Sequence, residues 1–140
     1  EFKRVLVRDE AHLFSILAEQ VLLRCPHVNP EKMQADLSLQ SAEFPPFIGN
    51  GVLMPHIYSD QVKEPACFVL SLEREMILQM TADTVSLVIF LLSPAGDSEG
   101  HLALLSEVAK LCQQVSSVEA ICLLNNHYEL IKFVNHELVG

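Results

Sequence analysis

The sequence predicts an α/β fold in which helices sandwich a mixed β-sheet. Apolar residues recur at helical spacing near both ends of the chain, and short apolar segments bounded by prolines and glycines lie between them. A length of 140 residues is typical of one compact domain, so we expect residues 1–140 to form a single domain. The first residue is Glu1 rather than Met, which also fits a domain excised from a longer chain.

Two helices are expected before the first strand. Asp9 is suited to cap a helix that ends at Cys25-Pro26. A second helix should open at Asn29-Pro30-Glu31 and run toward Gln40, because proline is favoured at the first helical position. Residues 42–47 include two adjacent prolines and are expected to form a loop. The apolar positions of the first helix are Leu13, Phe14, Leu17, Val21 and Leu22.

Three short strands are expected next, over residues 51–54, 66–72 and 86–92. The last is apolar almost throughout, which is typical of a strand covered on both faces. Residues 73–75 are interpreted as a solvated turn and residues 93–97 as a loop. A strongly amphipathic helix should begin at Ser98. Ser116 or Ser117 is expected to cap a further helix to Leu124, and Asn125 or Asn126 to cap a last helix.

The charge balance excludes some classes of function. Nine basic and eighteen acidic residues give a net charge of −9, which repels nucleic acid. The longest purely apolar run, Leu87 to Leu92, is far too short to span a bilayer, so no membrane insertion is expected. The mean hydropathy is nevertheless positive, which hints at exposed apolar area for protein partners.

The four cysteines, Cys25, Cys67, Cys112 and Cys122, show no two-residue spacing of a metal or redox motif. Each lies among apolar neighbours, so reduced thiols and a cytoplasmic location are expected. Cys25 and His27 would supply only two metal ligands, with no third or fourth nearby. No metal or other cofactor is therefore predicted.

His56 is the first candidate for chemistry. It directly follows Pro55, whose backbone angle is fixed, and Gly49 and Gly51 precede it on either side of Asn50. Such a frame can hold an imidazole rigidly at a strand edge. A neutral imidazole can attack a phosphoryl group without a separate base, and the resulting N–P bond is labile enough to pass the group on. The alternative is a half-buried histidine in a turn.

His101 is the second candidate. It lies in or near the first turn of the helix that Ser98-Glu99-Gly100-His101 should open. Unpaired amides at a helix N-terminus favour an anion, and His101 can donate a hydrogen bond to a phosphoryl oxygen. The alternative is a polar residue at a helix start.

These segments resemble a known family. Its active-site signature is similar to Ile48-Gly49-Asn50-Gly51-Val52-Leu53-Met54-Pro55-His56, and its second histidine and helix are similar to residues 101–109. The family is the fructose/mannitol-type enzyme IIA domain of the bacterial sugar phosphotransferase system. The likeness extends over nearly the whole chain, with only the two-helix pattern matching before Glu43.

The resemblance implies a mixed sheet flanked by helices. It implies that His56 accepts a phosphoryl group, that His101 steadies it, and that Asn50, Gly51, Pro55 and Ser98 are neighbours of the phosphoryl site. The implied partners are a small histidine phosphocarrier protein of the HPr type, as donor, and a IIB domain, as acceptor. In nitrogen-related and regulatory members, phosphorylation instead changes binding to a protein partner.

The sequence departs from the family pattern at two places. Gln40 stands where the family usually has an arginine, eight residues before Ile48, and glutamine cannot neutralise phosphoryl charge by a bidentate contact. Ile57-Tyr58 stands where small and basic residues are usual. These departures favour regulation over sugar transport. Three functions thus remain: a phosphoryl carrier for sugar uptake, a regulatory domain, and an interaction module without phosphoryl chemistry.

Overall fold

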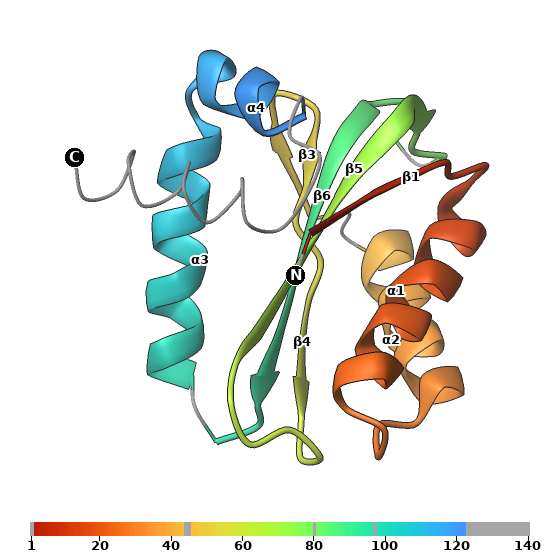
Figure 1. Ribbon diagram of the computed structural model, residues 1–140, viewed down its shortest axis with the longest axis vertical. Coiled ribbons are helices and arrows are strands. Elements are labelled where there is room, and N and C mark those ends of the chain that lie inside the picture. Colours follow the sequence, from red (N-terminus) through yellow and green to blue (C-terminus); the bar gives the residue numbers. More distant parts are fainter. Residues whose placement is uncertain (1, 44–45, 80, 97, 123–140) are drawn as a thin grey trace.

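The computed structural model describes residues 2–43, 46–79, 81–96 and 98–122, without the side chains of residues 98–102, 104–105 and 115–117. A mixed β-sheet lies between two pairs of helices, with α1 and α2 on one side and α3 and α4 on the other (Figure 1). The predicted fold class is confirmed.

The sheet is built around two long strands. Strands β5 (Ala66–Ile77) and β6 (Thr84–Pro94) pair antiparallel, and β1 (Phe2–Val5) lies parallel to β5 at one edge. On the other side of β6, β3 (Val52–Leu53) pairs parallel, and β2 (Phe47–Gly49) pairs antiparallel to β3. The strand order is β1-β5-β6-β3-β2, with β4 (His56–Ser59) pairing parallel to β6 beside this path.

Strands β3 and β4 follow one another along the same edge of β6. Val52 is opposite Leu87 and His56 is opposite Leu91, so the register continues from one strand to the other. Pro55 lies between them, and its carbonyl accepts a hydrogen bond from the Leu91 amide. The interruption at Pro55 therefore does not turn the chain away from β6.

The helices cover the two faces of this sheet. Helices α1 (Glu10–Arg24) and α2 (Pro30–Glu43) pack against one face, where Phe68 and Phe90 are fully buried. Helices α3 (Ser98–Cys112) and α4 (Val115–Cys122) pack against the other, over Leu87, Ile89 and Leu91. Because both faces are covered, β6 is apolar over most of its length, as the sequence indicated.

The predicted starts of the first two helices are confirmed. The Asp9 carboxylate accepts a hydrogen bond from the His12 amide at 2.8 Å, and the Asn29 side chain accepts from the amides of Glu31 and Lys32. The last turn of α2 is held to α1, because the buried Ser41 hydroxyl donates to the Glu10 carboxylate at 2.6 Å.

Several boundaries differ from the predictions. Strand β2 begins where a loop was expected, and β1 and β4 were not predicted. Residues 73–75 are not a separate turn: they are an exposed part of β5, where the register with β6 shifts. Strand β6 runs on to Pro94, and α4 begins at Val115, ahead of the predicted cap. The expected last helix lies outside the described residues.

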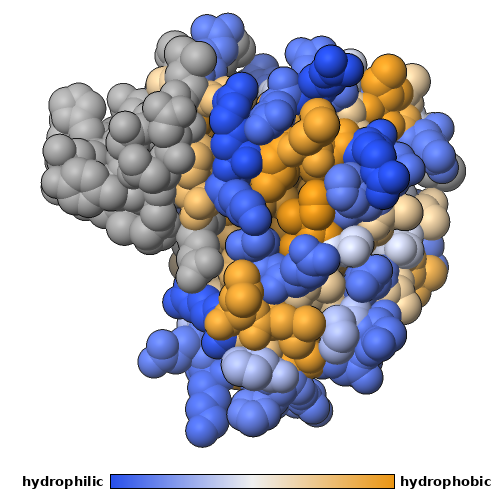
Figure 2. Space-filling view, turned by 45° about the vertical axis from the view of Figure 1, so that its right-hand side comes forward, coloured by the Kyte–Doolittle hydropathy of each residue, from blue (hydrophilic) through white to orange (hydrophobic). Residues whose placement is uncertain are grey.

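Apolar side chains also reach the surface. Figure 2 shows one face on which hydrophobic residues gather in patches between hydrophilic ones. The large exposed hydrophobic residues among those described are Leu6, Leu23, Leu39, Ile48, Tyr58 and Ile77. Within the described part of the chain, no helix combines the length and the apolar character needed to cross a membrane.

All four cysteines are free thiols. Cys112, at the end of α3, is almost fully buried, and this burial raises the pKa of its thiol to about 11. Burial likewise raises the pKa of the Cys67 thiol. Such thiols are protonated and poorly nucleophilic near neutral pH.

Candidate functional site

His56 is the first residue of β4 and is half-buried. The next residue, Ile57, packs against the core beneath α1 and α2. Because successive side chains of a strand point to opposite faces, the His56 side chain points to the face that α3 covers. Met54 packs in the core on that same face. The ring thus lies on the side of the sheet where the second predicted histidine is found.

One ring nitrogen of His56 is held by the backbone. Nδ1 lies 3.2 Å from the carbonyl oxygen of Met54. A carbonyl can only accept, so Nδ1 carries the proton in this hydrogen bond and the lone pair of the neutral ring is on Nε2. The sequence alone did not distinguish the two nitrogens.

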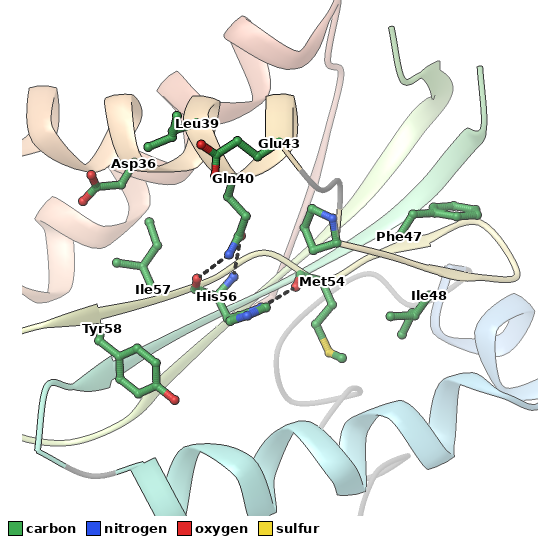
Figure 3. A pocket seen from close by; sticks show the side chains of 11 residues that line it. Asp36, Leu39, Gln40, Glu43, Phe47, Ile48, Met54, His56, Ile57 and Tyr58 are labelled. Carbon is green, nitrogen blue, oxygen red and sulfur yellow. Dashed lines mark hydrogen bonds between the residues drawn. The ribbon is translucent and has the colours of Figure 1, made fainter. Parts of the chain in front are cut away.

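The backbone of His56 is held by Gln40, which reaches down from α2 (Figure 3). The Gln40 side-chain amide donates to the His56 carbonyl at 3.1 Å, and its oxygen accepts from the His56 amide at 3.2 Å. The residue at the family's usual arginine position therefore contacts the phosphoryl-acceptor candidate directly, through its backbone. Sequence reasoning treated Gln40 only as a missing charge.

An open groove of about 800 Å³ lies beside His56, between α2 and the strands β2 and β4. We call it the His56 groove; it is lined by Asp36, Leu39, Gln40, Glu43 and residues 46–48, 54 and 56–58. Three of the exposed hydrophobic side chains, Leu39, Ile48 and Tyr58, belong to it. Its described lining contains two carboxylates and no lysine or arginine. The groove thus offers apolar area and negative charge next to the imidazole.

The turn Gly49-Asn50-Gly51 has positive φ at all three residues, which explains the two glycines. The Asn50 side chain donates to the carbonyls of Cys112 and Gln113, at 2.9 and 3.1 Å. These carbonyls lie at the C-terminal end of α3, where the last carbonyls of a helix lack partners within that helix. Asn50 therefore caps the C-terminus of α3.

Ser98 and His101 begin helix α3, as predicted, but their side chains lie outside the described residues. Their placement beside the phosphoryl group stays a prediction. Asn50 contacts the opposite end of this helix, and fifteen residues of α-helix span about 22 Å. The fold therefore does not gather Asn50 and the start of α3 around one point, and the role of Asn50 and Gly51 as phosphoryl neighbours also remains a prediction.

The described residues contain no group of three or more His, Cys, Asp or Glu side chains arranged to hold a metal ion. Cys25 and His27 lie beside a different hollow, with Arg24 and Lys63, away from the His56 groove.

A family model described as "Phosphoenolpyruvate-dependent sugar phosphotransferase system, EIIA 2" matches residues 4–137. The chain belongs to this family. No curated protein sequence matches it. The EIIA type 2 family is the one that the motif around His56 resembles, so that prediction is confirmed.

Solved structures share the fold of this EIIA domain. The nitrogen regulatory protein IIA-Ntr from Neisseria meningitidis superposes with a TM-score of 0.85 at 19% identity, covering 95% of this chain and 91% of that chain. IIA mannitol from Escherichia coli gives 0.71 at 17% identity, covering 94% and 95%. The Escherichia coli complex of enzyme IIA mannitol with phosphorylated IIB mannitol gives 0.72 at 16% identity, covering 97% and 99%.

Proposed function

We propose that this EIIA domain carries a phosphoryl group on Nε2 of His56, accepted from a histidine phosphocarrier protein of the HPr type and passed to a IIB domain. The observation that carries the proposal is the hydrogen bond between Nδ1 and the Met54 carbonyl. It holds the proton on Nδ1, so the lone pair on Nε2 can attack phosphorus while the N–P bond of the carrier's phosphohistidine breaks. In the second transfer, a nucleophile of the acceptor attacks phosphorus and the N–P bond to His56 breaks.

The His56 groove supports docking of protein partners at the imidazole. A protein that presents its own phosphorylated residue must exclude water around the transfer, and exposed Leu39, Ile48 and Tyr58 supply apolar contact area for this. A structurally similar IIA domain has been solved in complex with phosphorylated IIB. In our proposal His101 steadies the phosphoryl oxygens from the start of α3, and the transfer takes place in the cytoplasm.

The charges of the groove favour a second candidate, a regulatory role. Asp36 and Glu43 line the groove, and its described lining contains no cation to balance a phosphoryl group. Gln40 also cannot make the charge-assisted contact that an arginine would make with the phosphoryl group. Such a contact would stabilise the phosphorylated state by about 1.5–3 kcal/mol. A less stabilised phosphohistidine suits a switch whose state a protein partner senses. The similar fold of a nitrogen regulatory IIA protein agrees with this reading.

The test is phosphorylation with purified components. We expect the domain, incubated with phosphoenolpyruvate, enzyme I and HPr, to gain the mass of one phosphoryl group in an acid-labile bond. His56→Ala should lose the gain completely, whereas His101→Ala should change its rate or lifetime. His27→Ala is the matched control, because His27 is exposed and outside the His56 groove.

The outcomes separate the candidate functions. A wild-type domain that gains no mass, beside a control EIIA domain that does, would leave only the interaction module without phosphoryl chemistry. Label that persists in His56→Ala would mean that another residue is the acceptor. Transfer from the labelled domain to a IIB domain supports transport, and phosphorylation-dependent binding of a protein that takes no phosphoryl group supports regulation.

A further inference from the structure

Strands β3 and β4 follow one another along one edge of β6, and we call the two together the strand line. Alternate residues of this line direct their backbone groups away from β6, and the outward amides of Met54 and His56 both have partners. Strand β2 pairs with β3, and the Met54 amide donates to the Pro46 carbonyl at 2.8 Å. The next outward residue is His56, and its partner is the Gln40 side chain. Gln40 thus takes the place that a neighbouring strand would occupy.

The chemistry of this contact is specific to a side-chain amide. In an antiparallel ladder, a hydrogen-bonded residue pair exchanges two N–H···O bonds. The Gln40 amide reproduces this exchange with one donor and one acceptor, at 3.1 and 3.2 Å. Arginine has only donors and glutamate, when ionised, only acceptors, so neither can make both bonds.

Gln40 projects from a fixed helix turn. The neighbouring Ser41 is buried, and its hydroxyl donates to one oxygen of the Glu10 carboxylate. The other oxygen of Glu10 accepts from the Gln79 amide at 2.8 Å, after strand β5. The last turn of α2 is therefore tied to α1 and to the sheet, and a tied turn can hold a side chain in one place.

From these contacts we propose that Gln40 is a positioning residue, which fixes the backbone of His56 and thereby the ring tautomer that accepts the phosphoryl group. The inference rests on the proposed phosphoryl transfer at His56. It predicts that Gln40→Arg impairs phosphorylation. Arginine would bring the charge that the family pattern has here, but it would leave the His56 amide without its acceptor and loosen the start of β4.

The experiment compares three substitutions at Gln40 with one control. Gln40→Met keeps the length of the side chain and removes both hydrogen bonds, Gln40→Arg keeps only donors, and Gln40→Glu keeps only acceptors. Gln34→Arg is the control, because Gln34 lies on the same helix but outside the His56 groove. The readouts are hydrogen exchange of the His56 amide, the ¹⁵N signals of its imidazole at about pH 8, where free imidazole is neutral, and the initial rate of phosphorylation by phospho-HPr.

In the wild type we expect a protected His56 amide and imidazole signals of a ring protonated at Nδ1. Gln40→Met and Gln40→Arg should lose the protection, give mixed tautomers, and slow phosphorylation about tenfold, the effect of one to two ordinary hydrogen bonds. Gln40→Glu should retain amide protection, because its carboxylate can still accept from the His56 amide. Gln34→Arg should match the wild type in all three readouts.

Two results would overturn the proposal. One is an unchanged tautomer in both Gln40→Met and Gln40→Arg. The other is phosphorylation of Gln40→Arg at or above the wild-type rate, which would mean that the missing charge matters more than the lost acceptor. A wild-type domain that takes no phosphoryl group would instead refute the proposed function. The amide exchange and the imidazole signals would still decide whether Gln40 positions His56.

Discussion

The segment from Ile48 to His56 contains two halves that work in different ways. The glycine half, Gly49-Asn50-Gly51, uses three left-handed backbone conformations and the Asn50 side chain to cap helix α3. The histidine half, Met54-Pro55-His56, runs extended along β6 and presents an imidazole held by Met54 and Gln40. The first half is bound to the far end of α3, and the second is bound to α2.

This difference shows that residues close together in a short sequence motif can serve different purposes in the folded domain. The glycine half fixes where the strand line begins: the Gly51 carbonyl accepts from the amides of Ser86 and Leu87 at 2.8 and 3.1 Å. The histidine half places the chemical group five residues later. We therefore expect substitutions in the glycine half to lower stability and those in the histidine half to change phosphoryl chemistry. Substitutions at Gly51, Gly49 and Asn50 test this division.

The largest effect on stability is expected for Gly51→Ala. A Cβ atom there would lie 2.7 Å from the Ser86 hydroxyl oxygen, at a φ of +77°. Steric overlap and left-handed strain together should lower the free energy of unfolding by about 2–4 kcal/mol in urea titrations.

Gly49→Ala is the matched control for Gly51→Ala, because φ is +90° at Gly49 but nothing lies within 4 Å of the added atom. Gly49→Ala should lower the free energy of unfolding only by the backbone strain, about 1–2 kcal/mol. Adding Ser86→Ala to Gly51→Ala should recover most of the difference. Equal losses in the two glycine variants would show that the contact with Ser86 is unimportant.

A smaller effect is expected for Asn50→Asp. The carboxylate cannot donate to the carbonyls of Cys112 and Gln113, and it brings negative charge to a helix C-terminus. We expect a loss of about 1–2 kcal/mol in thermal or urea unfolding. The folded fraction should still be phosphorylated to the same extent as the wild type. A loss of phosphorylation in fully folded Asn50→Asp would place Asn50 in the phosphoryl site and break the division.

A pH-dependent effect is expected around Cys112, next to the capped end of α3, in the form of an alkaline destabilisation. Burial raises the pKa of this thiol from 9.0 to about 11, so the unfolded chain loses the proton first. The free energy of unfolding should therefore fall as the pH rises from about 9 through 11. Below about pH 9 the thiol is protonated in both states, and its contribution to stability is fully retained. Urea titrations of Cys112→Ala should show a shallower decline over this window. An identical decline would assign the pH dependence to other groups.

The sequence predicted the parts of the fold that bury a continuous apolar surface. The helices at Asp9 and Asn29 and the apolar strand β6 all have strong caps or long apolar runs, and they lie where they were expected. Strands β2 and β4 are three and four residues long, too short to show alternation. Glu73 and its neighbours suggested a turn because an exposed, irregular stretch within a long strand has the composition of a turn.

For the candidate site, the sequence indicated which histidine to examine but not the residues that support it. His56 was found through the glycine and proline residues before it and through the family resemblance. The contact of Gln40 with the His56 backbone depends on how α2 packs beside β4, sixteen residues away in sequence. No local pattern encodes such a contact. The groove likewise combines residues from α2, β2 and β4, which become neighbours only in the folded domain.

The packing of α1 and α2 against β5 and β6 has a consequence for synthesis. Both helices are complete by Glu43, but the strand residues that cover their apolar faces continue to Leu92, 49 residues later. At typical elongation rates these faces remain uncovered on the ribosome for roughly 2–10 s. Until then α1 and α2 of the nascent chain expose apolar faces that the sheet later covers, and slow translation between Glu43 and Leu92 would prolong that exposure.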